Sequence, residues 1–450
     1  MSLARVSALV ICAALALPAC QSSGPPTCDL TTRTQLATTT WPKFHADAAN
    51  SGRADVDLSG NSGAGGILFP PAGQTIGPTE TTPILGPAII YLGSSDTNVY
   101  ALEYDGQPAA LEGDITMTGA ITGSPLLGAD GTLFVPSNGQ LGQFRADGTT
   151  KNLAPLLGFD SASPNLWDGD GTAFVGTLSG GLSRVCPNGG VAYQVTFPAT
   201  QSPVGITQDP NLPNQDKPII IAAGLAGVVR AFNLAGRQLW SFFASATVNA
   251  AVLIDESTEL FYVADANGRV FSGALANGVP QAGFAFLADA GIGATPALGR
   301  DSATVPALYV GDLAGNLYAL DRVTGAVRWV FEADGPIGSS PAVAIGGSSD
   351  IIVFGADVLG SIPGTPGPVP IGGRVYAVRD DGSQGTLLWS FDAGSSIGAS
   401  SPSIGADGTV YIGRRGQQLA TGAQCPGGVG PCVINVGGGL IAIGPGAPSS

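Results

Sequence analysis

Few residues in this sequence could do chemistry, and their spacing favours other roles. The single histidine, His45, has no evident Ser or Cys partner for a nucleophilic mechanism, so we expect it at a surface or capping position. Asp168 and Asp170 in "DGDG" could hold calcium, but Asp-Gly between apolar runs is typical of a hairpin turn. No C-x-x-C pair occurs. We therefore predict no catalytic residue and no metal site.

The N-terminus contains an export signal. "MSLARVSALVICAALALPACQSS" has one Arg, then an apolar run over 6–17 that is too short to span a bilayer comfortably, then small residues. This order is typical of a secretory signal peptide. Leu17-Pro18-Ala19-Cys20 resembles the lipobox of bacterial lipoproteins, which implies cleavage before Cys20 and its acylation. Several acyl chains anchor a protein stably, and Gln21 favours the outer over the inner membrane. The alternative is a plainly secreted protein with a chance cysteine.

Four further cysteines could form disulfides, because an exported protein meets an oxidising compartment. Cys425 and Cys432 in "CPGGVGPC" close a small loop, and we predict that they pair. Cys28 and Cys186 could also pair, although nothing in the sequence requires it.

Composition favours strands and turns over helices. The chain has 68 Gly and 34 Pro among 450 residues, with many short runs of Val, Ile, Tyr and Phe. Only 11% of the residues are charged, and the net charge is −15. An acidic surface repels phosphate backbones, which excludes nucleic acid as a partner.

The apolar runs recur as a four-strand unit. Its template is a strand ending in Gly, a turn, a strand such as "LYAL", an Asp/Asn-Gly turn and a strand ending in Trp-x-Phe, then a fourth strand after Ser-Pro or Thr-Pro. The template recurs at 89–106, 219–242, 307–331 and 373–391. It predicts blades of about 40–60 residues, as in a β-propeller.

A proline marks the start of each unit, where it removes no ladder hydrogen bond. It recurs at Pro83, Pro125, Pro164, Pro203, Pro296, Pro341 and Pro402. The gap between Pro203 and Pro296 fits two units, and Val252 stands near the position where the intervening proline would be expected. The chain therefore predicts eight four-stranded blades.

The two ends of the repeat complement each other. The last unit lacks its outer strand, and 65–83 near the start matches 386–402, an outer strand with its linker. We therefore predict an all-β, eight-bladed β-propeller whose N-terminal strand completes the C-terminal blade, which removes open edges. A linear β-solenoid or two sandwiches would not need such an orphan strand. The predicted boundaries are a signal peptide at 1–19, a lipidated tether and lead-in segment at 20–64, the propeller at 65–446 and a tail at 447–450.

Residues 65–446 resemble the pyrroloquinoline-quinone-like propeller superfamily. The residues that carry the likeness are Ala319-x-Asp321-x-x-x-Gly325-x-x-x-Trp329 and "WPKFHADAANSGR" (41–53), in which we expect Asp47 and Arg53 to secure the segment. The plan is also similar to the propeller lipoprotein of the outer-membrane β-barrel assembly machine. In such propellers the motif tryptophan docks between blades, which implies that role for Trp240, Trp329 and Trp389.

Two insertions in the repeat mark loops that the scaffold does not need. They span 357–373 and 414–439, between second and third strands of adjacent blades, so both should project from one face. Arg414 and Arg415 lie there and are candidate partner-binding residues. A third insertion, 208–218, should point the other way. Neutral, tolerated insertions are the alternative.

These features predict a lipid-anchored, extracytoplasmic and non-catalytic scaffold that binds protein partners in the cell envelope as a monomer, without a cofactor. Envelope or outer-membrane protein assembly is the setting that the resemblance suggests. The first alternative is a quinone-dependent dehydrogenase, although the adjacent cysteines and the C-x-x-C-H motif often found in those enzymes are absent. The second is a propeller that binds glycans or small ligands at its central channel.

Overall fold

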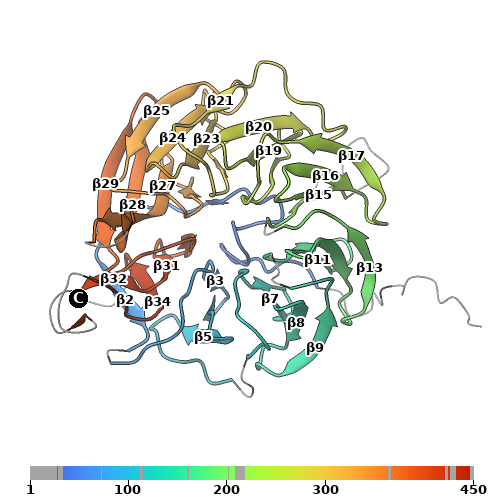
Figure 1. Cartoon of the computed structure of the whole chain (residues 1–450), viewed down its shortest axis with the longest axis horizontal. Helices are drawn as coiled ribbons and strands as arrows, with labels where there is room; N and C mark the ends of the chain where they lie inside the picture. Colours follow the sequence, from blue (N-terminus) through green and yellow to red (C-terminus); the bar gives the residue numbers. More distant parts are fainter. Residues whose placement is uncertain are drawn as a thin grey trace, which may run out of the picture.

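The computed structural model describes residues 28, 34–71, 73–111, 113, 115–159, 162–200, 202–207, 218–362, 366–420, 424–425 and 432–445. The regular elements in these ranges are strands, with no helix, and they form eight blades around a central axis (Figure 1). The predicted all-β, eight-bladed propeller is therefore confirmed. Within the same ranges no helix is long and apolar enough to cross a bilayer.

Blades 2 to 7 are antiparallel meanders of four consecutive strands, numbered outward from the axis. Blade 2 consists of β6 (Leu126–Leu127), β7 (Leu133–Ser137), β8 (Gln140–Phe144) and β9 (Thr150–Pro155). Blade 3 consists of β10 (Asn165–Trp167), β11 (Thr172–Thr177), β12 (Gly181–Val185) and β13 (Val191–Thr196). Blade 4 consists of β14 (Gly205–Ile206), β15 (Ile220–Ala223), β16 (Val228–Phe232) and β17 (Gln238–Phe243). Blade 5 consists of β18 (Leu253–Asp255), β19 (Leu260–Ala264), β20 (Arg269–Ala274) and β21 (Phe286–Leu287). Blade 6 consists of β22 (Ala297–Leu298), β23 (Ala307–Gly311), β24 (Asn316–Asp321) and β25 (Val327–Glu332). Blade 7 consists of β26 (Ala342–Ala344), β27 (Ile351–Gly360), β28 (Val369–Asp380) and β29 (Gly385–Asp392).

The alternation of antiparallel strands gives the ring two distinct faces. Turns between first and second strands and between third and fourth strands lie on one face, which we call the turn face. Turns between second and third strands and the links between blades lie on the other, which we call the linker face. The predicted Asp-Gly hairpins lie on the turn face, where Gly131 and Gly408 have φ of 79° and 83°, the left-handed region that glycine adopts without strain.

Blade 8 closes the ring with strands from both ends of the chain. β30 (Ser403–Ile404), β31 (Val410–Arg414) and β34 (Gly439–Ile443) are completed by β2 (Gly65–Phe69), which pairs antiparallel with β34. Gly65 faces Ile443 and Ile67 faces Ile441 in this register. The predicted closure is confirmed.

Blade 1 departs from the expected four regular strands. β3 (Ile84–Leu85), β4 (Ile89–Gly93) and β5 (Val99–Glu103) form a three-stranded sheet. Residues 107–111 and 115–117 cover the edge of β5 irregularly, with isolated bridges from Pro108 to Leu102 and from Thr116 to Asn98. Pro108 cannot donate to a ladder, which prevents regular pairing there.

Hydroxyl groups next to the predicted register prolines join neighbouring blades. Before five of the seven prolines, the Ser or Thr accepts a hydrogen bond from the backbone N–H of the equivalent residue one blade earlier, at 2.8–2.9 Å. The pairs are Thr82 to Ser124, Ser124 to Ser163, Ala251 to Thr295, Thr295 to Ser340 and Ser340 to Ser401. Ala251 precedes Val252, so the unit without a proline has the predicted register.

The lead-in residues 34–64, which we call the axial segment, cross the centre of the ring (Figure 1, blue). Their carbonyl groups accept hydrogen bonds from the innermost strands of successive blades, and β1 (Arg53–Ala54) pairs in parallel with β26. The donor–acceptor pairs are Leu85 to Trp41, Leu127 to Pro42, Ile206 to Ala48, Ile254 to Ala49, Leu298 to Ser51 and Val343 to Gly52. The ring is thus tied together by its own N-terminal segment, which lies outside the predicted propeller bounds of 65–446.

Candidate partner-binding surface and central channel

The insertion of blade 7 extends a hairpin out of the ring. β27 and β28 have ten and twelve residues, against five or six in the same positions of blades 5 and 6. The additional pairs run from Asp357 opposite Gly373 to Gly360 opposite Val369. Backbone pairing continues beyond the blade, so this insertion is a structured ribbon over its described residues.

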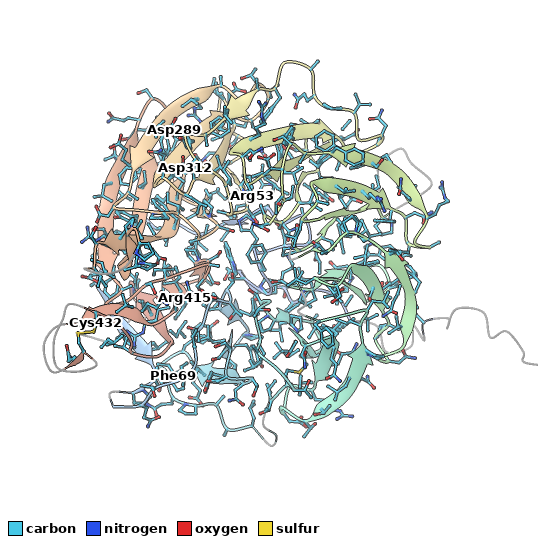
Figure 2. All side chains as sticks on the ribbon, viewed as in Figure 1. Arg53, Phe69, Asp289, Asp312, Arg415 and Cys432 are labelled. Atoms are coloured by element: carbon cyan, nitrogen blue, oxygen red, sulfur yellow. A yellow bond between two sulfur atoms is a disulfide. The ribbon has the colours of Figure 1, made fainter. Side chains whose placement is uncertain are left out.

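The insertion of blade 8 forms a second hairpin, of β32 (Gln417–Ala420) and β33 (Cys432–Asn435). Cys425 and Cys432 form a disulfide in it, as the sequence predicted. Figure 2 labels Cys432 and Arg415 in the same part of the ring.

The two hairpins pack together into one surface, which we call the insertion patch (357–362, 366–373 and 414–439 as far as described). β32 lies against β28. The linker between blades 7 and 8 also contacts the second hairpin. The Ser396 N–H donates a hydrogen bond to Gln417 O at 2.7 Å, and the Ser396 carbonyl accepts one from the Arg415 N–H at 2.8 Å. Both insertions therefore project from the linker face, as predicted.

The two candidate arginines have different environments. Arg414 is buried, with 9% of its surface exposed, and its Nε has no hydrogen-bond partner among the described residues. Burial lowers the pKa of its guanidinium. This burial makes Arg414 less accessible to a partner than Arg415, and its role in binding stays a prediction. Arg415 is partly exposed and pairs with Glu80 at 3.1 Å.

Asp357 connects the base of the patch to the linker. Its Oδ1 accepts N–H groups from Ile397 at 2.8 Å and Gly398 at 3.1 Å. Burial raises the pKa of this carboxyl group, and the two backbone donors and the charge of Arg415 oppose the rise. These contacts hold the ribbon at a defined angle to the ring.

A small cleft of about 310 Å³ opens on the patch. Its walls include partly exposed Val358 and Ile371, with Arg374 and Asp392 at the rim. Apolar side chains beside a charged rim are typical of a surface that binds another protein.

The three motif tryptophans lie between blades, on outer strands. The indole N–H of Trp240 donates to Leu275 O of blade 5 at 2.8 Å, and that of Trp329 donates to Asp380 Oδ1 of blade 7 at 2.9 Å. Trp389 packs against the apolar core that blades 7 and 8 share, and its Nε1 has no hydrogen-bond partner among the described residues. These contacts agree with the docking role that the resemblance implied.

Side chains of the axial segment occupy the central channel. Lys43 Nζ contacts Phe44 O, Asp47 O and Asn50 Oδ1, and the Asn50 amide donates to Val204 O and Val252 O of two blades. Burial lowers the pKa of Lys43 to about 7. The Lys43 side chain therefore stabilises the fold of the axial segment, and Asn50 ties the segment to blades 4 and 5.

His45 is buried in the channel rather than exposed, because the folded ring closes over it. Its Nδ1 lies 2.6 Å from Asn50 O and its Nε2 lies 3.1 Å from Pro341 O. Burial lowers its pKa to about 4. Asp47 accepts two hydrogen bonds from Ser51, and Arg53 pairs with Asp301 at 2.9 Å. All of these residues secure the segment.

The two aspartates of the "DGDG" turn and the remaining cysteines have structural roles where the structure describes them. Asp170 caps its turn through Thr172 and pairs with Arg184, whereas Asp168 accepts the Leu36 N–H at 2.6 Å. Cys28 and Cys186, left open by the sequence, form a disulfide. Cys20 and most of the third insertion, 208–217, lie outside the described residues. Those residues contain no cluster of three His, Cys, Asp or Glu side chains that could hold a metal ion.

A polar cavity of about 560 Å³ lies between blades 6 and 7 on the turn face. Arg300 pairs with Asp350 at 2.6 Å and Arg328 with Asp380 at 3.3 Å, and the Tyr309 hydroxyl contacts both carboxylates. These charges already neutralise one another, which is the arrangement of a structural network.

Comparison with known proteins finds several similar propellers. The family model described as outer membrane protein assembly factor BamB matches residues 225–421. A comparison with curated proteins found no significant match. The crystal structure of BamB from Moraxella catarrhalis superposes with a TM-score of 0.55 at 13% identity and covers 81% of this chain and 94% of that chain.

Two other solved structures share the fold at low identity. A europium-containing methanol dehydrogenase has a TM-score of 0.62 at 13% identity, covering 87% of this chain and 90% of that chain. The C-terminal WD40 domain of Sif2 has a TM-score of 0.58 at 11% identity, covering 85% and 99%. Together with the repeat and the closed ring, these matches show that the chain is an eight-bladed β-propeller, and that residues 225–421 are similar to the outer membrane protein assembly factor BamB.

Proposed function

We propose that this protein is a lipid-anchored scaffold of the cell envelope that binds a protein partner through the insertion patch and takes part in the assembly of outer-membrane proteins. The observation that carries the proposal is the packing of two insertions, from adjacent blades, into one surface. The ring closes without either of them.

Three features support this role. The Cys425–Cys432 disulfide closes the second hairpin and restricts it before binding, which lowers the entropy lost on association. Disulfides are typical of proteins outside the cytoplasm. The family match includes blade 7 and part of the patch, and its description names an assembly factor.

The test is a crosslinked pull-down of the tagged protein from native membranes. A variant lacking residues 418–436 should lose the partner that the intact chain retains. A variant lacking 208–217, the insertion between the first and second strands of blade 4, is the matched control and should retain it. Retention of the partner by both variants would place binding elsewhere on the ring, and absence of a partner from the intact chain would contradict a scaffold role.

The second candidate is a quinone-dependent dehydrogenase, which the similarity to methanol dehydrogenase favours. The axial segment weighs against it, because it crosses the centre of the ring (Figure 1) and its Lys43, His45 and Asn50 side chains are buried. Pyrroloquinoline quinone added with calcium should leave the melting temperature unchanged. A rise that grows with ligand concentration would instead indicate binding by mass action.

A further inference from the structure

The Cys28–Cys186 disulfide and the predicted acylation site lie close together in the chain. Cys186 follows β12, in the turn between the third and fourth strands of blade 3, so the disulfide lies on the turn face. Cys28 follows Cys20 by only eight positions. A fully extended chain of that length spans at most about 29 Å.

The point of attachment is firmly held. Cys186 is buried; its N–H donates to Gly190 O at 2.7 Å and its carbonyl accepts the Gln143 side chain of blade 2 at 3.0 Å. The axial segment begins on the same face, where Thr34 Oγ1 accepts the Asp130 N–H at 3.2 Å and Leu36 donates to Asp168. Both features place the start of the tether on the turn face beside blades 2 and 3.

The insertion patch lies on the opposite side of the ring from the Cys28–Cys186 disulfide, and on the other face. It belongs to blades 7 and 8, which lie across the ring from β11 and β13 of blade 3 (Figure 1). It also projects from the linker face, whereas the disulfide is on the turn face. A compact chain of this size is about 50–55 Å across, which exceeds the reach of the eight-residue tether.

We propose that the Cys28–Cys186 disulfide sets the orientation of the propeller on the bilayer, with the turn face of blade 3 towards the lipid and the insertion patch away from it. This inference rests on the proposed lipid anchor. An inverted ring would hold Cys28 above the bilayer by the height of a blade, about 20 Å for the strands alone, with turns added on both faces. The chain from Cys20 to Cys28 would then have to be almost fully extended along the outer edge of the ring.

Without the disulfide the tether begins at Thr34 rather than Cys28. The chain from Cys20 to Thr34 spans up to about 50 Å, which allows either face to approach the bilayer. The disulfide therefore selects which surface stays open to a partner at a distance from the membrane.

The test uses the full acylated chain in vesicles that contain a lipid-bound acceptor dye. A donor dye is placed, through an introduced non-natural residue, at exposed Asn188 in the turn of blade 3 or at exposed Ser361 in the ribbon of blade 7. We expect severalfold stronger energy transfer from Asn188 than from Ser361. Equal transfer from the two positions, or stronger transfer from Ser361, would overturn the inference.

Two variants separate orientation from folding. Cys28→Ser with Cys186→Ser should abolish the difference between the positions, while Cys425→Ser with Cys432→Ser should keep it. A Gly/Ser insertion that doubles the chain between Cys20 and Cys28 leaves both disulfides intact and should also reduce the difference. If the difference persists in the lengthened chain, the disulfide does not set the orientation.

The anchor itself has a separate readout. Mass spectrometry of the purified chain should show acylation at Cys20. An unacylated chain that does not bind vesicles would overturn the anchor and this inference together, whereas an acylated chain with equal transfer would overturn only the orientation.

Discussion

The hydroxyl group of Ser340 in blade 7 accepts a hydrogen bond of 2.9 Å from the backbone N–H of Thr295 in blade 6. The same relation joins five pairs of adjacent blades, each time at the residue before the register position. Because it joins first strands of adjacent blades, it transmits the register of one blade to the next.

Ser340→Ala removes the acceptor of the buried Thr295 N–H. We expect the free energy of unfolding to fall by about 1–3 kcal/mol, the penalty of an unsatisfied buried donor. Chemical denaturation measures it. The matched control is Ser339→Ala, because the Ser339 hydroxyl is also buried but has no hydrogen-bond partner among the described residues. Equal losses in both variants would contradict the role of the hydroxyl.

Acid should destabilise the protein through His45. Burial, the largest cause, and the charge of Lys43 lower its pKa from 6.5 to about 4, opposed by Asn50 O, Asp47 and Pro341 O. The unfolded state therefore binds more protons between pH 6.5 and 4, and stability falls as pH falls through this window, by about 3 kcal/mol in all.

His45→Gln should remove this part of the pH dependence. His45 is the only histidine in the chain, so the difference between the wild-type and variant slopes over pH 4–6.5 belongs to it. Unfolding free energies at a series of pH values give both slopes. Parallel slopes would show that His45 does not titrate differently on unfolding.

Replacing the docking tryptophans should separate packing from hydrogen bonding. Trp329→Phe loses packing and the bond to Asp380, whereas Trp389→Phe loses packing alone. We expect the first variant to be less stable by about a further 1.5–3 kcal/mol, the range for hydrogen bonds to charged groups. Denaturation of the two variants side by side measures the difference, and equal stabilities would assign Trp329 a packing role only.

The two disulfides should contribute unequally to stability. Cys28 and Cys186 are separated by 158 residues, and Cys425 and Cys432 by 7. Loop-closure entropy predicts about 5 kcal/mol for the long loop and about 2 kcal/mol for the short one. Replacing each pair by serine and measuring the free energy of unfolding tests this order. A larger loss from the short loop would show that local strain or packing outweighs chain entropy.

The sequence by itself determined the features that repeat locally. Turn glycines, register prolines and strand patterning predicted eight blades, placed a unit boundary at Val252 and indicated that β2 completes blade 8. Each of these signals lies within a few residues of the structure it specifies, and the repeat confirms it several times.

Only the tertiary structure decided the contacts made once by distant residues. His45 meets Pro341 across 296 positions, Cys28 meets Cys186, and Arg414 is buried. Such contacts have no repeated pattern that could be recognised, because they depend on where the closed ring places its inner strands and turns. The axial segment looked like a lead-in because its partners are eight separate blades, and these meet only after the ring has closed.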